Sequence, residues 1–497
     1  MELTNNKNKL ISILPFVISI IFFIILLYVC MKYRCLSIDE GYTRGILNLN
    51  VMDMISVTAN DVHPPLYYLI AALFIKIANA LSFNVDFIFL IKFPSIIPYL
   101  IILLISLTKI RKEYGLLAGG IFSLTLIAMS EFFTYYITAR MYSWTMIFLV
   151  ISFLYVKDVL EHNDLKSWIL LSIFSVLGAY THYFSMLTTI IIYLMLFVWI
   201  LANKENTPIK DSLKKFFISA ILGIIIYIPW IFTLIQQLGD VQESFWLPPL
   251  TIGNLIEYFS YTLTISNNQI IRIMSLLLIL ALFLIFIMKF LKNKNNDNLF
   301  LLIGCTSFIG TLVLSLILSI VYKPILYSRY MLPSIGIFWL CVSIKLANLK
   351  VNKSIILMII LLIAIVGAFN VYHEVNEISD LPRFLNYSER LLSGIDNNDT
   401  IIIYDADNRF IRTHSDLTNV YKQFGSYSLN NETSGMKYKS PDVCYDTFVI
   451  PDDLNKYPNK NVYLIMFHSN NLTLPDNVHA EKIGTVQHGT FYKLKLV

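Results

Sequence analysis

The chain has 497 residues, of which 56% are hydrophobic and only 14% are charged, and its mean hydropathy is +0.65. Soluble domains carry roughly 25% charged residues, so this composition excludes an ordinary soluble protein and indicates an integral membrane protein. The formal net charge of +5 is modest, and Lys and Arg cluster in particular loops, which favours cytoplasmic loops over a nucleic-acid-binding surface.

The apolar runs are long enough to cross a bilayer as helices, because about 20 residues span roughly 30 Å of hydrocarbon. Leu10 to Cys30 carries no charge and no small-x-small cleavage pattern follows it, so we interpret it as an uncleaved first span. Ten further spans are predicted near Phe87 to Thr108, Tyr114 to Phe133, Met141 to Val156, Trp168 to Tyr180, Phe184 to Ala202, Phe216 to Ile235, Ile270 to Phe290, Phe300 to Val321, Tyr330 to Ile344 and Ser354 to Tyr372.

The basic residues predict which loops face the cytoplasm. With Lys7 and Lys9 inside, every loop on the same side is basic, and these loops carry Lys109, Arg111, Lys112, Lys157, Lys166, Lys204, Lys210, Lys214, Lys215, Lys289, Lys292, Lys294, Lys345, Lys350 and Lys353. If the apolar stretch Leu66 to Leu81 crossed the bilayer, it would invert everything after it, so we predict a helix along the outer interface. The N-terminus is then inside and the C-terminus outside.

The loops on the predicted outer side contain the chemically interesting residues. They read SIDEGYTRG (37–45), DVHPP (61–65), TYYITARMYSW (134–144), AYTHYF (179–184), QQLGDVQESFWLPPLTIGN (236–254) and YSRYMLP (327–333). The opposite loops show mostly Lys, Asn and Asp, as solvated connections do. Acidic, basic, His and aromatic groups from distant segments therefore predict a site at the outer mouth of the bundle.

Each of these residues also has a plain structural interpretation. Asp39 and Glu40 lie close to the membrane, where a carboxylate needs a cation or a reaction to use it, and Arg44 one helical turn on could be that cation. Asp53 and Asp61 are as readily explained as solvated loop carboxylates. His63 could simply precede the two prolines that open a helix, His182 could be an interfacial histidine bonded to backbone, and Arg140 could snorkel to the surface. Their gathering on one face favours function.

In this order, SIDEGYT, HPPLYY, ARMYS, THYF, FWLPP and SRYMLP resemble the polytopic glycosyltransferases of the GT-C type. The likeness is to the bacterial and archaeal branch of the protein mannosyltransferase and aminoarabinose transferase superfamily, which is glycosyltransferase family 39-like, and it covers about residues 10 to 372. It implies a GT-C transmembrane domain over residues 1–372, with about eleven transmembrane helices and the interfacial helix. It also implies sugar donors linked to polyprenyl phosphates, presented at the outer leaflet, and inverting transfer.

The same resemblance assigns roles to individual residues. Asp39 inherits the role of catalytic base, with Glu40 assisting or binding a metal, and His63 and Arg140 match the family's HPP and ARMY motifs. Many members of that family carry a glutamate just before the ARMY motif, where this chain has Thr138. The resemblance therefore assigns no residue of this chain to the role of that glutamate.

General chemistry points the same way. A carboxylate can take the proton of an acceptor hydroxyl, and a departing phosphate needs fixed positive charge or a divalent cation. Arg44, His63, Arg140, His182 and Arg329 are the candidates for the phosphate, with Tyr330 beside them in the substrate site. Asp39, Glu40 and His63 could hold Mg²⁺, Mn²⁺ or Zn²⁺, although they show no strict ligand spacing. The acceptor could be a glycan, a lipid or a protein.

After Tyr372 the composition becomes polar, and residues 373–497 predict a small extracytoplasmic α/β domain. Strands are expected at 400–408, at 461–469 and in two segments near the end, with helices at 381–392 and 407–424. The DAD of residues 405–407 could instead bind a metal on a nucleotide sugar, and Cys35 and Cys444 could form a disulfide. We interpret the domain as an accessory for acceptor binding or support.

Two other classes of protein remain open. A transporter or flippase of lipid-linked sugars is the main alternative, but transporters tend to place ionisable residues near mid-membrane, whereas here the span centres are nearly free of charge. A polytopic sensor with an outer ligand domain would leave the acids of the first loop unexplained.

Overall fold

The structure is a computed structural model that describes residues 2–32, 38–83, 85–202, 209–244, 250–261, 263, 268–379, 388, 390–396, 399–404, 420–424, 461–467, 478–486 and 489–496. The chain divides into two compact units. The first comprises Met1–Cys30, Asp61–Asn84 and Leu90–Tyr372, and the second comprises Met31–Asn60, Val85–Phe89 and His373–Val497.

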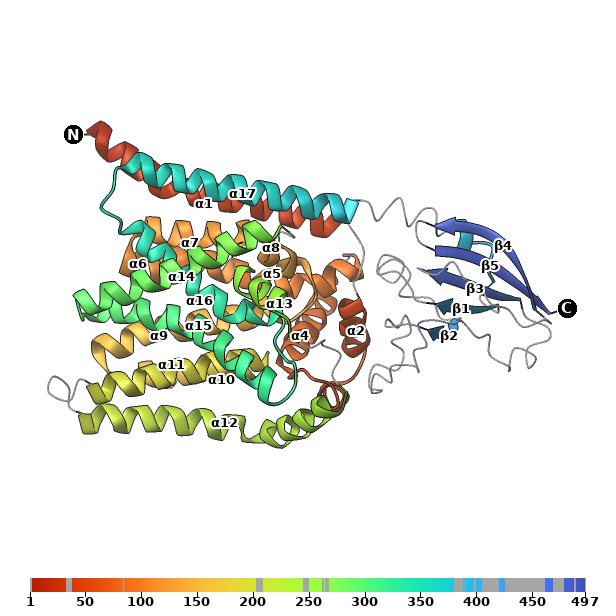
Figure 1. Cartoon of the computed structure of the whole chain (residues 1–497), viewed down its shortest axis with the longest axis horizontal. Coiled ribbons are helices and arrows are strands. Elements are labelled where there is room, and N and C mark those ends of the chain that lie inside the picture. The colour runs from red at the N-terminus through yellow and green to blue at the C-terminus, as the bar shows by residue number, and fades with distance from the viewer. Residues whose placement is uncertain are drawn as a thin grey trace. The chain divides into compact units, whose positions relative to one another are not determined.

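The first unit is helical (Figure 1). Its elements are α1 (Glu2–Lys32), α4 (Leu66–Ala80), α5 (Phe87–Ile105), η1 (Ser106–Ile110), α6 (Arg111–Tyr114), α7 (Leu116–Ala128), α8 (Ser130–Ile137), α9 (Tyr142–His162), α10 (Leu165–Ala179), α11 (Tyr183–Ala202), α12 (Ile209–Ser244), α13 (Ile252–Ser260), α14 (Gln269–Lys292), α15 (Asn296–Val321), η2 (Ser328–Met331), α16 (Leu332–Ala347) and α17 (Lys353–Ser379). The ends of α1, α5 and α17 continue into the second unit.

Nine of the eleven predicted spans are confirmed, because nine helices in the described residues are long and apolar enough to cross a membrane. The other two form shorter apolar helices: the span predicted over Tyr114 to Phe133 contains α7, which has only 13 residues, and the one predicted over Trp168 to Tyr180 corresponds to α10, which has 15. The expected span from Tyr114 to Phe133 is interrupted at both ends, because Gly115 adopts a φ of +92° before α7 and Met129 is extended after it. The apolar stretch predicted to lie along the interface forms α4, a 15-residue helix.

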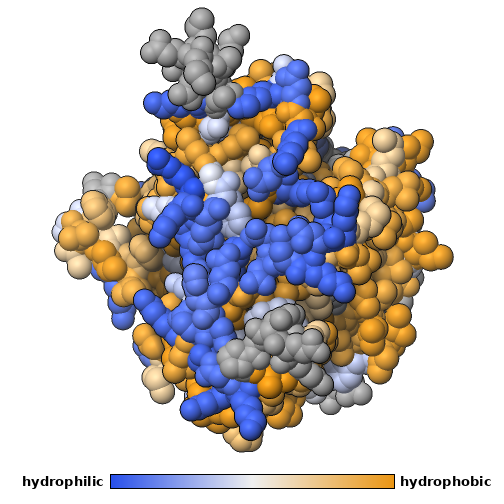
Figure 2. Space-filling view, turned by 90° about the vertical axis from the view of Figure 1, so that its left-hand side faces the viewer, coloured by the Kyte–Doolittle hydropathy of each residue, from blue (hydrophilic) through white to orange (hydrophobic). Residues whose placement is uncertain are grey.

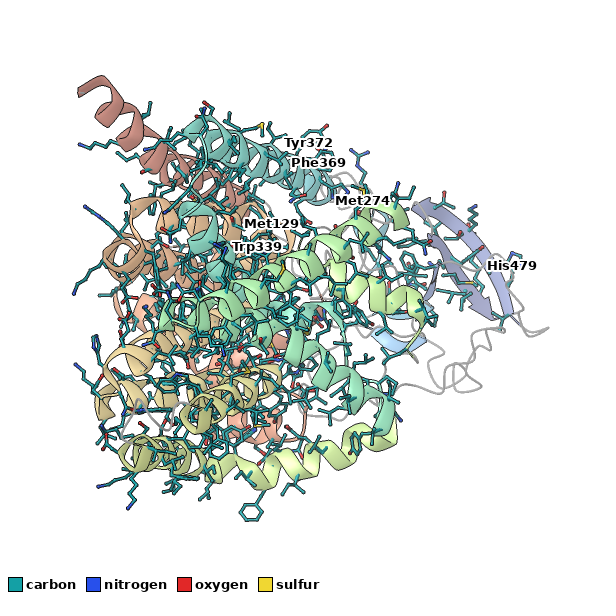
Figure 3. The ribbon with its side chains drawn as sticks, turned by 60° about the vertical axis from the view of Figure 1, so that its left-hand side comes forward. Met129, Met274, Trp339, Phe369, Tyr372 and His479 are labelled. Carbon is teal, nitrogen blue, oxygen red and sulfur yellow. The ribbon has the colours of Figure 1, made fainter. Side chains whose placement is uncertain are left out.

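The core of the first unit is built around α9 and α16, which are buried over 83% of their most apolar window, against 17% for α12 and α14. Met274 on α14 and Phe369 and Tyr372 on α17 are at least 65% exposed, whereas Met129 and Trp339 lie inside (Figure 3). Because a membrane span is apolar on every face, sequence periodicity does not separate the inner helices from the outer ones.

Small residues let the central helices approach closely, as is common between membrane helices. A Cβ atom built on Gly304 of α15 would lie 2.3 Å from Cys341 Sγ of α16 and 2.7 Å from Phe153 Cζ of α9. At Gly367, α17 packs against α1 and α7, since the same construction would meet Phe22 and Ala128 at 2.7 Å.

Substitution Gly304→Ala should therefore lower the thermal stability of the purified protein. An extra methyl group in a close-packed core costs about 1–3 kcal/mol. The melting temperature in detergent, followed by intrinsic fluorescence, checks this. Gly239→Ala is the matched control, because nothing lies within 4 Å of its constructed Cβ. Equal melting temperatures for the two variants would contradict the packing described.

The predicted cytoplasmic loops meet at one end of the first unit. Lys109 contacts Asp158 there, Lys157 pairs with Asp297, and Asn163 donates to Ser212 at 3.0 Å, so the ends of α5, α9, α12 and α15 come together. Figure 2 shows this end as a hydrophilic band bordered by apolar side chains. We call it the basic end.

The second unit contains α2 (Ile38–Leu47), α3 (Val51–Ala59) and a five-stranded sheet of order β2-β1-β3-β5-β4. The strands are β1 (Thr400–Tyr404), β2 (Val420–Phe424), β3 (Val462–Phe467), β4 (Val478–Val486) and β5 (Gly489–Leu496). β1 is parallel to β2 and β3, whereas β5 is antiparallel to β3 and β4. Every residue of β3 is buried, as expected for a central strand covered on both faces.

The predicted strands of this sheet are confirmed where the structure describes them. The predicted helix over 407–424 is wrong at its end, because residues 420–424 form β2, where pairing with β1 decides the conformation. The DAD at 405–407, the FWLPP segment at 245–249 and the residues Cys35 and Cys444 lie outside the described residues.

Candidate functional site

His63 lies at the centre of a hydrogen-bonded chain. Its Nδ1 is 2.9 Å from Asp61 Oδ2, and its Nε2 is 3.3 Å from Nη2 of Arg140. A guanidinium can only donate, so Nε2 must accept from Arg140, which leaves the ring proton on Nδ1 to be donated to Asp61. The contacts therefore define a neutral His63 whose tautomer is fixed by its two neighbours.

Asp61, which the sequence explained equally well as a solvated loop residue, is part of this chain. Burial pushes the pKa of its carboxyl up, but the hydrogen bond from His63, a backbone hydrogen bond from Val62 and the charge of Arg140 outweigh this and hold the pKa below its usual value. Its side chain is 23% exposed. Asp61 thus orients His63 as a charged acceptor.

Arg140 is 3% exposed, so it does not snorkel to the surface. Besides His63, its Nη1 donates to the hydroxyl of Tyr68 on α4 at 3.2 Å. Because the HPP prolines begin α4 directly after His63, Tyr68 in the first turn of this helix can reach the same guanidinium. Tyr68 was not among the predicted site residues, although its spacing after the HPP motif could have suggested it.

The backbone of Arg140 is held by α5. Pro98 has no N–H, so the carbonyl of Pro94 four residues earlier has no helical donor, and Trp144 Nε1 donates to it at 2.8 Å. Ser143 Oγ donates to the carbonyl of Ser95 at 3.0 Å. Pro98 therefore frees one of the two carbonyls of α5 that accept hydrogen bonds from the start of α9, just after Arg140.

His182 lies between α10 and α11 and is 4% exposed. Its Nδ1 accepts from the backbone N–H of Phe184 at 3.2 Å, so the neutral ring carries its proton on Nε2. Burial first, and then the positive charges of Arg140 and Arg329, lower its pKa well below the usual value. At neutral pH, His182 is a hydrogen-bond donor without charge.

Arg329, in η2, is surrounded by aromatic rings. Its Cζ lies 5.1 Å from the ring centroid of Tyr327, 5.9 Å from that of Tyr330 and 6.0 Å from that of Tyr142. Cation–π attraction to these faces holds the guanidinium in place without neutralising it. The Tyr330 ring in turn lies 5.1 Å from that of His182.

Five of the eight predicted site residues therefore come together: His63, Arg140, His182, Arg329 and Tyr330. With Asp61, Tyr68 and Tyr142 they form what we call the basic-aromatic cluster. It lies where α9 begins, and the basic end lies where α9 ends; the 21 residues between span about 30 Å. Two guanidinium groups, one buried at Arg140 and one partly exposed at Arg329, with aromatic walls suit a phosphate attached to an apolar chain.

The other three predicted residues lie on α2, in the second unit. Asp39 and Glu40 occupy its first turn, where the helix dipole favours carboxylates, and Arg44 occupies its last turn. Glu40 is 3% exposed and the Asp39 carbonyl accepts from Thr43 Oγ1 at 3.1 Å. Arg44 Cζ lies 6.0 Å from the ring centroid of Phe87.

Thr138, at the position where the sequence resemblance leads one to expect a glutamate, does not substitute for a carboxylate. Its hydroxyl donates to the carbonyl of Thr134 at 2.8 Å, one turn back at the end of α8. Within the described residues, no group of three or more His, Cys, Asp and Glu side chains could hold a metal ion. Both ring nitrogens of His63 are engaged, so a metal ion bound there would have to displace Arg140.

The buried His182 predicts a stability that depends on pH. Between its lowered folded-state pKa and the usual value of about 6.5, the unfolded chain binds more protons than the folded protein, so stability should fall as the pH drops below about 6.5. The slope from one such group is at most about 1.4 kcal/mol per pH unit. When thermal unfolding is measured between pH 7.5 and 5, the stability of His182→Gln should decrease less with falling pH than that of the wild type. An unchanged slope in His182→Gln would refute this.

No protein-family model matches the sequence, and no curated protein is significantly similar to it. The fold, however, is similar to that of ArnT from Cupriavidus metallidurans, solved in the apo state and bound to undecaprenyl phosphate, with a TM-score of 0.59 at 11% identity over 96% of this chain and 97% of ArnT. It is also similar to the archaeal oligosaccharyltransferase AglB from Archaeoglobus fulgidus, solved with an inhibitory peptide and a dolichol-phosphate. There the TM-score is 0.52 at 10% identity, over 91% of this chain and 69% of AglB.

Both relatives are GT-C glycosyltransferases. The chain is thus a multi-pass membrane protein with the GT-C fold, as the sequence motifs predicted.

Proposed function

We propose that this protein is a membrane glycosyltransferase that moves a sugar from a polyprenyl phosphate to an acceptor hydroxyl or amine, with inversion. The observation that carries the proposal is the basic-aromatic cluster: Arg140 and Arg329, held by buried polar and aromatic partners, sit at the end of the bundle opposite the basic loops. The GT-C fold shared with ArnT and AglB, which were solved with polyprenyl phosphates, supports it.

The cluster would act on the leaving group. When the bond between the anomeric carbon and the phosphate oxygen breaks, the electron pair stays on the phosphate, and its growing charge needs donors that are already in position. The guanidinium groups of Arg140 and Arg329 can supply fixed charge, and the neutral His182 a further N–H. Because Asp61 fixes His63 and His63 accepts from Arg140, the guanidinium is oriented before substrate binds.

The acceptor side needs a base. In our proposal the Asp39 carboxylate takes the proton of the acceptor as its oxygen or nitrogen attacks the anomeric carbon from the face opposite the phosphate, so a single displacement inverts the configuration. Glu40 assists by its charge in the same helical turn. Mg²⁺, Mn²⁺ or Zn²⁺ at Asp39 and Glu40 would supply charge stabilisation, and it remains a prediction.

The orientation belongs to the proposal. Lysines and arginines gather at the basic end, which the positive-inside rule assigns to the cytoplasm, so the cluster and the C-terminal sheet are placed outside. Single cysteines at exposed positions, such as Lys350 at the basic end and Asp53 on α3, can be labelled in intact cells with a reagent that does not cross membranes. Labelling at position 350 and none at position 53 would invert the orientation.

The direct test is an enzymatic assay. The purified protein is given a panel of radiolabelled polyprenyl-phosphate sugars with envelope extract as acceptor, and both released polyprenyl phosphate and new glycoconjugate are measured. We expect one donor class to be consumed. If no donor is consumed but the protein moves a lipid-linked sugar between the leaflets of proteoliposomes, the chain is a flippase and the proposal fails.

A further inference from the structure

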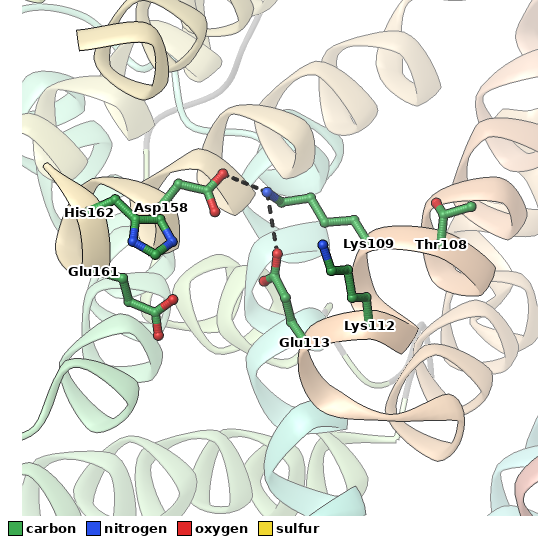
Figure 4. A pocket seen from close by; sticks show the side chains of 7 residues that line it. All are labelled: Thr108, Lys109, Lys112, Glu113, Asp158, Glu161 and His162. Atoms are coloured by element: carbon green, nitrogen blue, oxygen red, sulfur yellow. Dashed lines mark hydrogen bonds and ion pairs between the residues drawn. The ribbon is translucent and has the colours of Figure 1, made fainter. Parts of the chain in front are cut away.

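A hollow of about 600 Å³ opens at the basic end, between the turn that ends α5 and the C-terminal end of α9 (Figure 4). Charges of both signs line it: two lysines, Lys109 and Lys112, and three carboxylates, Glu113, Asp158 and Glu161. The basic-aromatic cluster lies at the other end of α9, so the hollow plays no part in the transfer proposed above.

Some of these charges already stabilise the helix ends. Lys109 Nζ lies 2.6 Å from Asp158 and 3.3 Å from Glu113, and it faces the Tyr155 ring at 5.0 Å. These contacts tie the end of α5 to α9 and explain three of the five charged groups as structural. Glu161 lies 2.5 Å from Lys157, one turn earlier in α9.

Lys112 has no such structural role. Across the described residues it has no carboxylate within 4 Å, and its exposed side chain lines the hollow beside Glu113 (Figure 4). Glu161 is 39% exposed and shares its lysine with Asp297, so its carboxylate can still accept a further donor. The hollow therefore offers one available cation and one available carboxylate.

This charge pattern selects among ligands. A simple anion would meet three carboxylates, and the described residues hold no group of three side chains that could bind a metal ion. A molecule with both an anionic and an ammonium group matches the two available groups, because each end finds a charge-assisted hydrogen bond.

An apolar stripe leads into the hollow. Leu100 and Leu104 lie one turn apart on the same face of α5, and Leu107 follows in η1; they are 42%, 59% and 44% exposed. They run toward Thr108, which lines the hollow. Because α5 belongs to a helical stretch long and apolar enough to cross a membrane, we expect the stripe to face hydrocarbon and to end near the headgroups.

The lining is held in shape by a π-helical turn, η1, in which the N–H of Arg111 donates to the carbonyl of Ser106. A Cβ at Gly119 of α7 would lie 2.3 Å from that carbonyl oxygen, so α7 packs directly behind the turn. Single π-helical turns are frequent at functional sites.

We propose that this hollow binds the headgroup of a zwitterionic phospholipid with a primary ammonium group, of the phosphatidylethanolamine type. Lys112 pairs with the phosphate, Glu161 accepts from the ammonium group, and an acyl chain lies along Leu100, Leu104 and Leu107. A trimethylated ammonium has no N–H to donate, and a glycerol headgroup has no positive charge, so both should bind less well.

The test uses the full-length protein in nanodiscs with equal amounts of phosphatidylethanolamine, phosphatidylcholine and phosphatidylglycerol. Lipid retained on the protein is counted by native mass spectrometry. We expect phosphatidylethanolamine to exceed each of the others about tenfold, as one charged hydrogen bond allows. Lys112→Ala and Glu161→Gln should each remove that preference, and Lys350→Ala, an exposed lysine at the same end outside the hollow, should keep it.

Equal retention of the three lipids, or a preference for phosphatidylglycerol, would overturn the proposal. So would full retention of the preference in both Lys112→Ala and Glu161→Gln, provided that their melting temperatures match that of the wild type. Sugar transfer measured in lipid-free detergent should be unchanged in these variants, so this proposal and the proposed function can fail separately.

Discussion

Replacement of Asp39 with asparagine should lower the rate of sugar transfer by about 10²- to 10⁴-fold, the usual contribution of a general base. Asparagine keeps the size and the hydrogen-bonding capacity of the side chain but cannot take up the acceptor proton. Since Asp39 is in the first turn of α2, the exchange also removes one favourable interaction with the helix dipole, a loss of only about 0.3–1 kcal/mol. Folding should therefore survive, as size-exclusion chromatography and thermal unfolding can verify.

The matched control for this experiment is Asp53→Asn. Asp53 is likewise an acid in the first turn of a short helix, α3, in the same unit, but its side chain is exposed. It should keep near-normal activity. If Asp39→Asn also turned over donor at a near-normal rate, the base would have to be another group, and Glu40→Gln would be the next variant to measure.

Replacement of Arg140 with lysine should weaken the binding of polyprenyl phosphate by about tenfold to a hundredfold, the range for loss of one hydrogen bond to a charged group. Lysine keeps the charge but lacks the planar fork with which Arg140 reaches His63 and Tyr68 together. Binding to the purified protein can be measured by titration calorimetry with a short-chain polyprenyl phosphate.

Arg111→Lys provides the comparison for Arg140→Lys, since Arg111 is exposed at the basic end. Its affinity for polyprenyl phosphate should match that of the wild type. Unchanged affinity in Arg140→Lys would remove the cluster from the phosphate site. Asp61→Asn, which weakens the orientation of His63, should give a smaller loss in the same direction.

The spans could be predicted well because hydrophobicity over about 20 residues is a local property and the basic loops mark one side. The shortening of the span predicted over Tyr114 to Phe133 could not be predicted, because a turn at Gly115 and an extended Met129 divide an apolar run without interrupting its hydrophobicity. In the second unit, Val420 to Phe424 pairs with β1 rather than continuing a helix, which is a matter of long-range contacts.

The site was predicted as a set of loops and motifs, and its internal connections were not. Nothing in the local sequence distinguishes a snorkelling arginine from one that is 3% exposed and bonded to Tyr68 and His63. Likewise, the sequence does not distinguish Asp61 from other loop carboxylates, whereas the structure shows its Oδ2 2.9 Å from His63 Nδ1. Because Pro98 has no N–H, the sequence alone shows that the carbonyl of Pro94 lacks its usual helical donor. The donor that takes this place, Trp144, lies on another helix and could not be predicted.

By itself, the sequence determined that this is a membrane protein, where its helices run and at which end its basic loops gather, because these depend on composition and spacing along the chain. Only the tertiary structure decided that His63, Arg140, His182 and Arg329 share one site. It also decided which ring nitrogen of each histidine carries the proton. The reason is physical: protonation and orientation depend on which donors and acceptors lie within about 3 Å, and those partners come from distant parts of the chain.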